Sequence, residues 1–232
     1  MQLKKLIWLL ITIMAGSVAF AQKIVEDANV EERLLKGSFN KLHLQGNLFV
    51  YLSQDAVESV AVSADIANDR GSIQTYVQDG KLFVSGGKGK SRCRVYLSFK
   101  ALESIEISGL TSVDVVGSIQ QDELRMSVSG KGKFSGSVSL ERIDVTASGL
   151  SAIDLAGKVG NASVTLSGVS HMYAKDLRAR ICTANVSGSS IIKINVSEKL
   201  TVVASGTSNI KYLGDPVIKK ELFGLAAVEQ DQ

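Results

Sequence analysis

The stretch "ASGLSAIDLAG" at residues 147–157 decides the fold, because near-copies of it recur along half of the chain. A Ser-Gly pair followed by alternating apolar residues stands six times in the sequence, with its glycines at Gly109, Gly130, Gly149, Gly168, Gly188 and Gly206. The separations between successive glycines are 21, 19, 19, 20 and 18 residues. A period near 20 residues that persists over several copies is typical of a solenoid, in which each repeat stacks on its neighbours.

Apolar residues alternate with polar ones on both sides of each glycine, which is the periodicity of β-strands with one buried face. The positions four residues after the glycines are all apolar: Val113, Phe134, Ile153, Met172, Ile192 and Ile210. A second glycine often follows eight residues after the first, as at Gly117, Gly157 and Gly214, so each repeat is predicted to have two short strands and two corners. Stacked repeats would form parallel ladders about 4.8 Å apart around a continuous core.

The predicted fold is therefore all-β: a right-handed parallel β-helix with about 20 residues per coil. The hand follows from the strong right-handed preference of parallel β connections. A β-propeller is the main alternative, but its blades have about 40 residues or more, twice the unit found here.

The sequence predicts five segments: a signal peptide at residues 1–21, a linker at 22–36, a β-rich N-terminal part at 37–100, the Ser-Gly repeats at 101–215 and a C-terminal cap or tail at 216–232. The part at 37–100 is either irregular first coils or a cap over the solenoid end, and its Asp79-Gly80 pair predicts a hairpin. Pro216, which cannot donate a ladder hydrogen bond, is expected to mark the last coil.

The first residues have the pattern of an export signal. Lys4 and Lys5 precede an apolar stretch at residues 6–18, and "AFAQ" predicts cleavage after Ala21. The apolar stretch is shorter than the about 20 residues needed to span a membrane, and no later segment predicts a transmembrane helix. We therefore expect an exported product that is periplasmic, on the cell surface or secreted.

Composition limits the partners. Removal of the signal leaves 24 basic and 23 acidic residues, so a nucleic-acid partner is not expected. Cys93 and Cys182 both lie on the apolar phase of an alternating run, and we interpret them as buried thiols in preference to a disulfide. Both interpretations remain open at this point, because pairing depends on the distance between the two Cα atoms.

The residues five positions after the glycines face outward and differ in chemistry between coils. Five of them form the candidate binding face: Asp114, Asp154, Tyr173, Lys193 and Lys211. The alternative is that they are ordinary charges on a solvated surface. No catalytic, cofactor or metal site is expected, because His43 and His171 are the only histidines and lie far apart in the sequence. Two carboxylates and a Lys or Arg meeting in one groove would instead favour an enzyme.

Several segments in a fixed order carry a family resemblance: "SFNKLHLQGNLFVYLSQ" at residues 38–54, "VQDGKLFV" at 77–84, the serial Ser-Gly repeats and "IKYLGDPVIKKELFG" at 210–224. Together they resemble the head GIN domain family of auto-transporter adhesins, a domain of unknown function in exported proteins of Bacteroidota. The resemblance covers about residues 37–224. It implies a right-handed β-helix and an adhesin-like role, and it brings no binding residues to carry over.

Three functions are compatible with these patterns. We expect a non-catalytic binding module whose partner is a glycan, a host surface protein or an envelope component. The alternatives are a lyase or hydrolase that acts on polysaccharide, and a structural scaffold of the cell envelope. The sequence leaves the ligand and the oligomeric state open.

Overall fold

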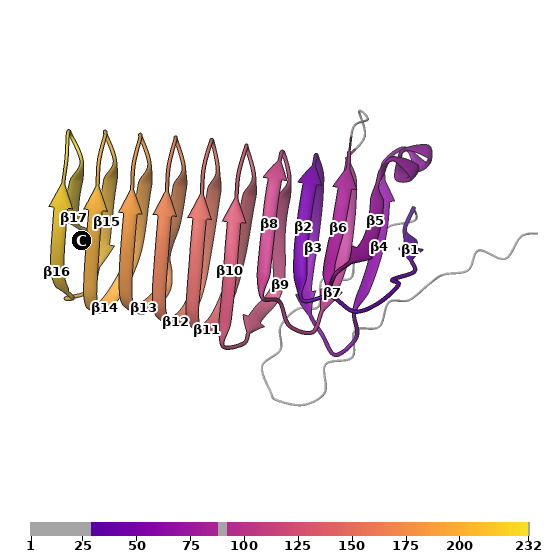
Figure 1. Ribbon diagram of the computed structural model, residues 1–232, viewed down its shortest axis with the longest axis horizontal. Helices are drawn as coiled ribbons and strands as arrows, with labels where there is room; N and C mark the ends of the chain where they lie inside the picture. The colour runs from indigo at the N-terminus through magenta and orange to yellow at the C-terminus, as the bar shows by residue number, and fades with distance from the viewer. Residues whose placement is uncertain (1–28, 88–91, 232) are drawn as a thin grey trace, which may run out of the picture.

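The computed structural model describes residues 29–87 and 92–231, so the predicted signal peptide lies outside the described residues. The described chain is an all-β parallel solenoid with about 7 turns about 19 residues apart (Figure 1), which confirms the predicted fold class. In Figure 1 the front strands run upward, the chain crosses at the top to the back ladder, and from residue 104 onward each coil lies to the left of the one before it. This is the right-handed sense.

Two parallel ladders form the walls of the solenoid. The first contains β6 (Lys81–Gly86), β2 (Lys41–Gly46), β8 (Ser104–Gly109) and β10 (Glu123–Val128). The second contains β7 (Cys93–Phe99), β3 (Leu48–Gln54) and β9 (Ser112–Gln120). Four long strands then contribute their first half to the second ladder and their second half to the first ladder. These strands are β11 (Lys133–Ala147), β12 (Ala152–Leu166), β13 (His171–Val186) and β14 (Ile191–Ala204). They are followed by β15 (Asn209–Leu213), β16 (Val217–Leu222) and β17 (Ala227–Gln230).

In the four repeats that contain β11 to β14, the second corner differs from the expectation of two separate strands. β11 and β12 continue through it, and their pairing register passes without a shift through Val138 opposite Gly157. Gly157 still has the positive φ of 106° that the sequence pattern suggested for a corner. The corner is thus a bend within a paired strand, because the ladder hydrogen bonds survive the change of direction.

The Ser-Gly corner is tight, and its glycines stack directly on one another. Gly149 has φ 78°, a conformation that glycine adopts without strain. A Cβ atom there would lie 2.7 Å from the carbonyl oxygen of Gly130 in the preceding coil. The same carbonyl accepts a 2.7 Å hydrogen bond from the Leu150 amide. Glycine is therefore required both by the backbone angle and by the close approach of two coils.

A row of buried hydroxyls lies beside these glycines, two residues farther along the chain. Its members are Thr111, Ser151, Ser170, Ser190 and Ser208, all at most 1% exposed. Ser170 Oγ donates to the Ser167 carbonyl at 2.8 Å, and Ser190 and Ser208 repeat the contact at 2.9 Å in their own coils. In these three coils the buried hydroxyl and the corner carbonyl satisfy each other, as buried polar groups usually do. The "SGxS" spacing was visible in the sequence, but only its first Ser was singled out.

The predicted inward positions form the core. The residues four after the repeated glycines are all at most 1% exposed: Val113, Phe134, Ile153, Met172, Ile192 and Ile210. Cys93 and Cys182 are buried thiols that form no disulfide, as the alternation predicted. They belong to β7 and β13, which lie in distant coils.

The first coils are stacked out of sequence order. β2 lies between β6 and β8, and β3 lies between β7 and β9, so the coil at residues 81–99 is spatially outside the coil at residues 41–54. Figure 1 shows β6, β2 and β8 as successive neighbours along the solenoid. Hydrophobic alternation fixes which face of a strand is buried but not which strand is its neighbour, so this exchange was not predicted.

An antiparallel cap covers this end. It contains β1 (Glu31–Arg33), β4 (Ser59–Ala64), the 3-10 helix η1 (Ala67–Ser72) and β5 (Gln74–Gln78). β4 pairs with β7, and β5 pairs with β6 through a hairpin in which Asp79 and Gly80 both have positive φ, 50° and 70°. Residues 37–100 therefore hold both coils and a cap, and the hairpin prediction is confirmed.

The C-terminal segment corrects another expectation. Residues 216–232 were expected to cap the solenoid or trail from it, but β16 and β17 form one more parallel coil on β14 and β15. Gly224, with φ 73°, stacks on Gly206 and makes a seventh copy of the corner. This repeat was missed because Phe223 replaces the Ser that precedes the other glycines.

Candidate functional site

The predicted outward residues form one row across the second ladder. The pairing register places Asp114 next to Ser135, then Asp154, Tyr173, Lys193 and Lys211. The row continues to Tyr51 and Tyr96 toward the N-terminal end and to Glu229 toward the C-terminal end. The backbone is therefore regular along this row, whereas the side chain differs from coil to coil.

A change in coil length interrupts the regular surface within this row. The coil that begins at Gly168 has 20 residues, and the next coil, which begins at Gly188, has 18 residues. The extra residues appear as a register shift between β13 and β14. Ala174 pairs with Ile194, and the next pair of the ladder is Arg178 with Asn195, so the residues between Ala174 and Arg178 have no partner in β14. Such a bulge bends the strand and redirects its side chains. Lys175 and Asp176 lie in this bulge and are exposed.

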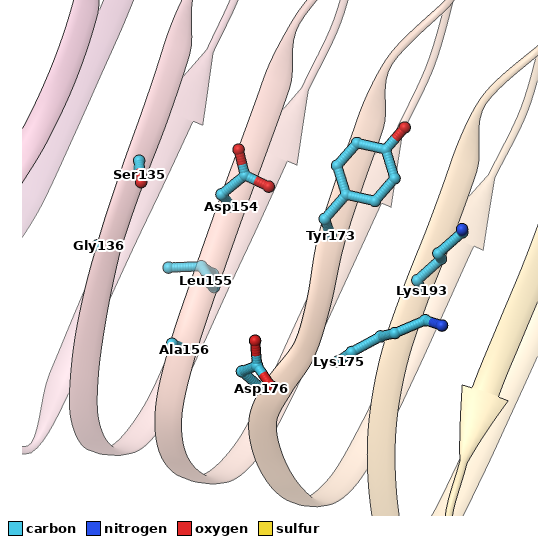
Figure 2. Close-up of a pocket in the computed structure, with 9 residues that line it drawn as sticks. All are labelled: Ser135, Gly136, Asp154, Leu155, Ala156, Tyr173, Lys175, Asp176 and Lys193. Carbon is cyan, nitrogen blue, oxygen red and sulfur yellow. The ribbon is translucent and has the colours of Figure 1, made fainter.

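A groove of about 470 Å³ lies beside the bulge, and it spans four coils. Its residues are Ser135, Gly136, Asp154, Leu155, Ala156, Tyr173, Lys175, Asp176 and Lys193. Figure 2 shows Asp154, Tyr173 and Lys193 at one level on successive strands, with Lys175 and Asp176 nearer the bend. Gly136 and Ala156 leave the hollow open because neither has a long side chain.

Tyr173 is the aromatic group of the groove, and 43% of it is exposed. The Lys193 Nζ lies 5.7 Å from the centre of its ring, within the range of a cation–π contact. The His171 ring lies nearly parallel to it, with centroids 6.2 Å apart. The two rings offer an apolar surface beside a cation, and His171 had been considered only as a metal ligand.

A carboxylate from the last described residue reaches the lysines of this surface. Lys175 Nζ forms an ion pair with Asp231, although β14 and β15 lie between their strands. The Asp231 amide donates to the Tyr212 carbonyl at 2.8 Å, which fixes the backbone beside the lysines. The hydrogen bond from Lys175, together with the charges of Lys175, Lys211 and Lys193, lowers the pKa of the Asp231 carboxyl.

The groove holds only part of the predicted face. The groove is lined by Asp154, Tyr173 and Lys193. Asp114 lies outside it, two coils from Asp154 toward the N-terminal end, and Lys211 lies outside it beside Asp231. Sequence reasoning missed Lys175, Asp176 and Asp231. The uneven glycine spacing of 20 and then 18 residues was the signal for the bulge.

A second polar cluster lies on the first ladder near the N-terminal end. The Glu106 carboxylate is 2.9 Å from His43 Nδ1 and accepts a 2.9 Å hydrogen bond from Lys81 Nζ. These contacts, His43 first and then Lys81, lower the pKa of the Glu106 carboxyl. The exposed Tyr76 stacks on Phe83 with centroids 4.9 Å apart. His43 contacts the same Phe83 ring, so it is a hydrogen-bond partner of Glu106 that packs against an aromatic surface.

Within residues 29–87 and 92–231, no three His, Cys, Asp or Glu side chains are grouped closely enough to hold a metal ion. In the same part of the chain, no helix has the length and apolarity required to cross a membrane.

Comparison with known proteins agrees with this architecture. A family model described as "Putative auto-transporter adhesin, head GIN domain" matches residues 38–216. No curated protein matches the chain.

Solved structures give the same fold. A "putative adhesin" from Bacteroides fragilis NCTC 9343 is 24% identical, with a TM-score of 0.79 over 87% of this chain and 96% of that chain. A "putative adhesin" from Parabacteroides merdae ATCC 43184 is 16% identical, with a TM-score of 0.70 over 88% and 96%. A "putative lipid binding protein" from Parabacteroides distasonis ATCC 8503 is 18% identical, with a TM-score of 0.68 over 88% and 96%. At these identities the likeness shows the fold alone.

Proposed function

We propose that this chain, which belongs to the head GIN domain family of auto-transporter adhesins, is an exported, non-catalytic module that binds its partner at the groove around Tyr173. The observation that carries the proposal is the position of the groove. It lies where one coil bulges, on the outward row whose side chains differ from coil to coil. A scaffold that repeats its backbone and varies one exposed row is suited to recognition on a rigid surface.

An array of glycans and envelope components, probed with the purified protein, tests this function. Binding should occur and should weaken about tenfold in Tyr173→Ala, because an aromatic anchor carries much of the energy of such a contact. Tyr51→Ala is the matched control, since Tyr51 lies in the same row but outside the groove. Identical array profiles for the wild type and Tyr173→Ala would refute the proposal.

Export is tested separately. The N-terminal pattern supports cleavage after Ala21, and N-terminal sequencing of the protein from the producing cell would show Gln22 as the first residue. Fractionation of the same cells then separates a periplasmic location from a surface or secreted one. Recovery of the full-length chain in the cytoplasm would refute export.

A second candidate function has a specific observation in its favour. Asp154 and Asp176 line the same groove as Lys175 and Lys193, which are the group types that a polysaccharide lyase or hydrolase uses. However, no hydrogen bond or ion pair joins either aspartate to another side chain among the described residues, whereas catalytic groups are usually held by such contacts. Incubation with polysaccharides, followed by assays for new reducing ends and for unsaturated products, distinguishes the two functions. Product formation that disappears in Asp154→Asn would establish the enzyme.

A further inference from the structure

On the surface around the groove, the carboxylate of Asp231 lies among three lysines. Lys175 forms an ion pair with Asp231, and Lys193 and Lys211 are neighbours in the outward row at the next two coils. The Asp231 carboxylate is supplied by the chain's own last coil, and its backbone is held by the Tyr212 carbonyl. The lysines of this surface therefore already hold a carboxylate in the free protein.

We propose that Lys175, Lys193 and Lys211 form a subsite for the carboxylate of an acidic polysaccharide, and that Asp231 occupies this subsite in the free protein. The inference rests on the proposed binding function and names its ligand class. A ligand uronate would displace Asp231 from Lys175 and gain the neighbouring Lys193. Lysine suits this exchange because its flexible stem and point charge can move between two carboxylates.

The neighbouring groups favour a sugar as the bearer of the carboxylate. The exposed face of Tyr173 can pack against the apolar face of a pyranose, and the parallel His171 ring extends that surface. Asp154, next to Tyr173 in the row, can accept hydrogen bonds from sugar hydroxyls. An aromatic ring between a hydroxyl-binding carboxylate and a lysine matches a uronic acid residue better than a peptide side chain.

The balance of charge also argues against a dense polyanion. Besides the lysines, the surface carries the carboxylates of Asp154, Asp176 and Glu229, and Glu229 is the neighbour of Lys211 in the row. These carboxylates repel closely spaced phosphates or sulfates. A polymer with one carboxylate per sugar can place its charge on the lysines and its hydroxyls on the acidic groups.

Titration with a galacturonic acid oligomer at low ionic strength tests the inference, with a neutral maltose oligomer of the same length as the control. Asp231→Asn should bind the galacturonate oligomer about threefold more tightly than the wild type, because the competing carboxylate is removed. Glu221→Gln is the matched variant, since it removes the same charge from the last coil on the other ladder. Its affinity should equal that of the wild type.

Two further variants assign the binding to the subsite. Lys193→Met should weaken binding of the acidic oligomer about threefold or more, and Tyr173→Ala about tenfold. Lys158→Met removes an exposed lysine from β12 outside the groove and should have no effect. Near-ultraviolet circular dichroism of each variant shows that the fold is retained.

The outcomes separate this inference from the function on which it rests. Tighter binding by Asp231→Asn together with loss in Lys193→Met supports both. Binding of the maltose oligomer through Tyr173, with no preference for the acidic oligomer, overturns the inference and leaves the binding function standing. Equal loss in Lys158→Met and Lys193→Met overturns the inference as non-specific ion exchange. Absence of any array ligand that depends on Tyr173 overturns the proposed function itself.

Discussion

Gly149 lies directly over Gly130, so closely that a Cβ atom on Gly149 would be 2.7 Å from the Gly130 carbonyl oxygen. This oxygen also accepts the Leu150 amide hydrogen bond, so it cannot withdraw without breaking the ladder at the corner. The same stacking occurs at each Ser-Gly corner, with a Cβ-to-oxygen distance of 2.4 to 3.0 Å. The repeated motif is thus a structural requirement of coil stacking.

Gly149→Ala should therefore lower the free energy of unfolding by about 3 kcal/mol, since the substitution adds a steric clash to the strain of a positive φ. Gly117→Ala is the matched control: it has φ 85° but nothing within 4 Å of its added Cβ, so it carries the strain alone. Urea unfolding followed by circular dichroism measures both. Equal midpoints for the two variants would show that close coil contact contributes nothing.

The repeats illustrate how far this sequence determines its structure. Alternation around each glycine correctly predicts the inward column at Ile153 and the outward row at Asp154, because both follow from the twofold period of a strand. The exchange of the coils at residues 41–54 and 81–99 has no such signal, since both coils have the same apolar pattern.

The candidate site was predictable only in part, for a similar reason. The row that contains Tyr173 follows from local periodicity. The contact between Lys175 and Asp231 joins residues 56 positions apart and depends on how far a lysine reaches across two strands. No local pattern encodes that distance.

The contacts of Glu106 with His43 and Lys81 make a small, pH-dependent contribution to stability. His43 and Lys81 lower the pKa of this carboxyl in the folded protein, so its contribution is present above the ordinary pKa of a glutamate and is lost as the pH falls through the lowered value. We expect Glu106→Gln to cost about 0.5 kcal/mol at neutral pH, because the pair is partly exposed to solvent, and nothing once the pH is well below the folded pKa.

Urea unfolding of the wild type and Glu106→Gln across the acid range measures this difference. Glu123→Gln is the control on the neighbouring strand β10, because the side-chain contact of Glu123, with Arg142, is longer, 3.8 Å. A stability difference that grows as the pH falls would contradict the assignment.

Because both cysteines are buried, we expect their thiols to react slowly with labelling reagents in the native protein. Cys182 lies in the core, and burial raises the pKa of its thiol to about 12, so the reactive thiolate is scarce at neutral pH. Cys93 is equally buried in a distant coil. Reaction with a chromogenic disulfide reagent should be slow for both thiols in the native protein and fast in urea. Ser135→Cys, on the exposed row, should label at once, and rapid labelling of the two native cysteines would contradict the inward assignment.

The last coil carries a charge where earlier coils carry core residues. Lys220 is the register partner of Val202, which is 1% exposed and belongs to the apolar column that precedes each corner glycine by four residues. The outer edges of β16 and β17 have no further coil on them in the described chain, whereas the N-terminal end is covered by the antiparallel cap. An inward-pointing charge on an edge strand is a known protection against edge-to-edge association.

Lys220→Val should therefore associate through its C-terminal end. The substitution completes the apolar column and exposes it beside two unpaired strand edges, so a second copy can stack on this end. Because the other end is capped, association should stop at one additional copy and not extend into fibres. Light scattering after size-exclusion chromatography at increasing protein concentration should show a mass twice that of the wild type. Lys219→Val, whose side chain is on the outward phase, should elute as the wild type does, and an unchanged mass for Lys220→Val at all concentrations would show that Lys220 does not guard this edge.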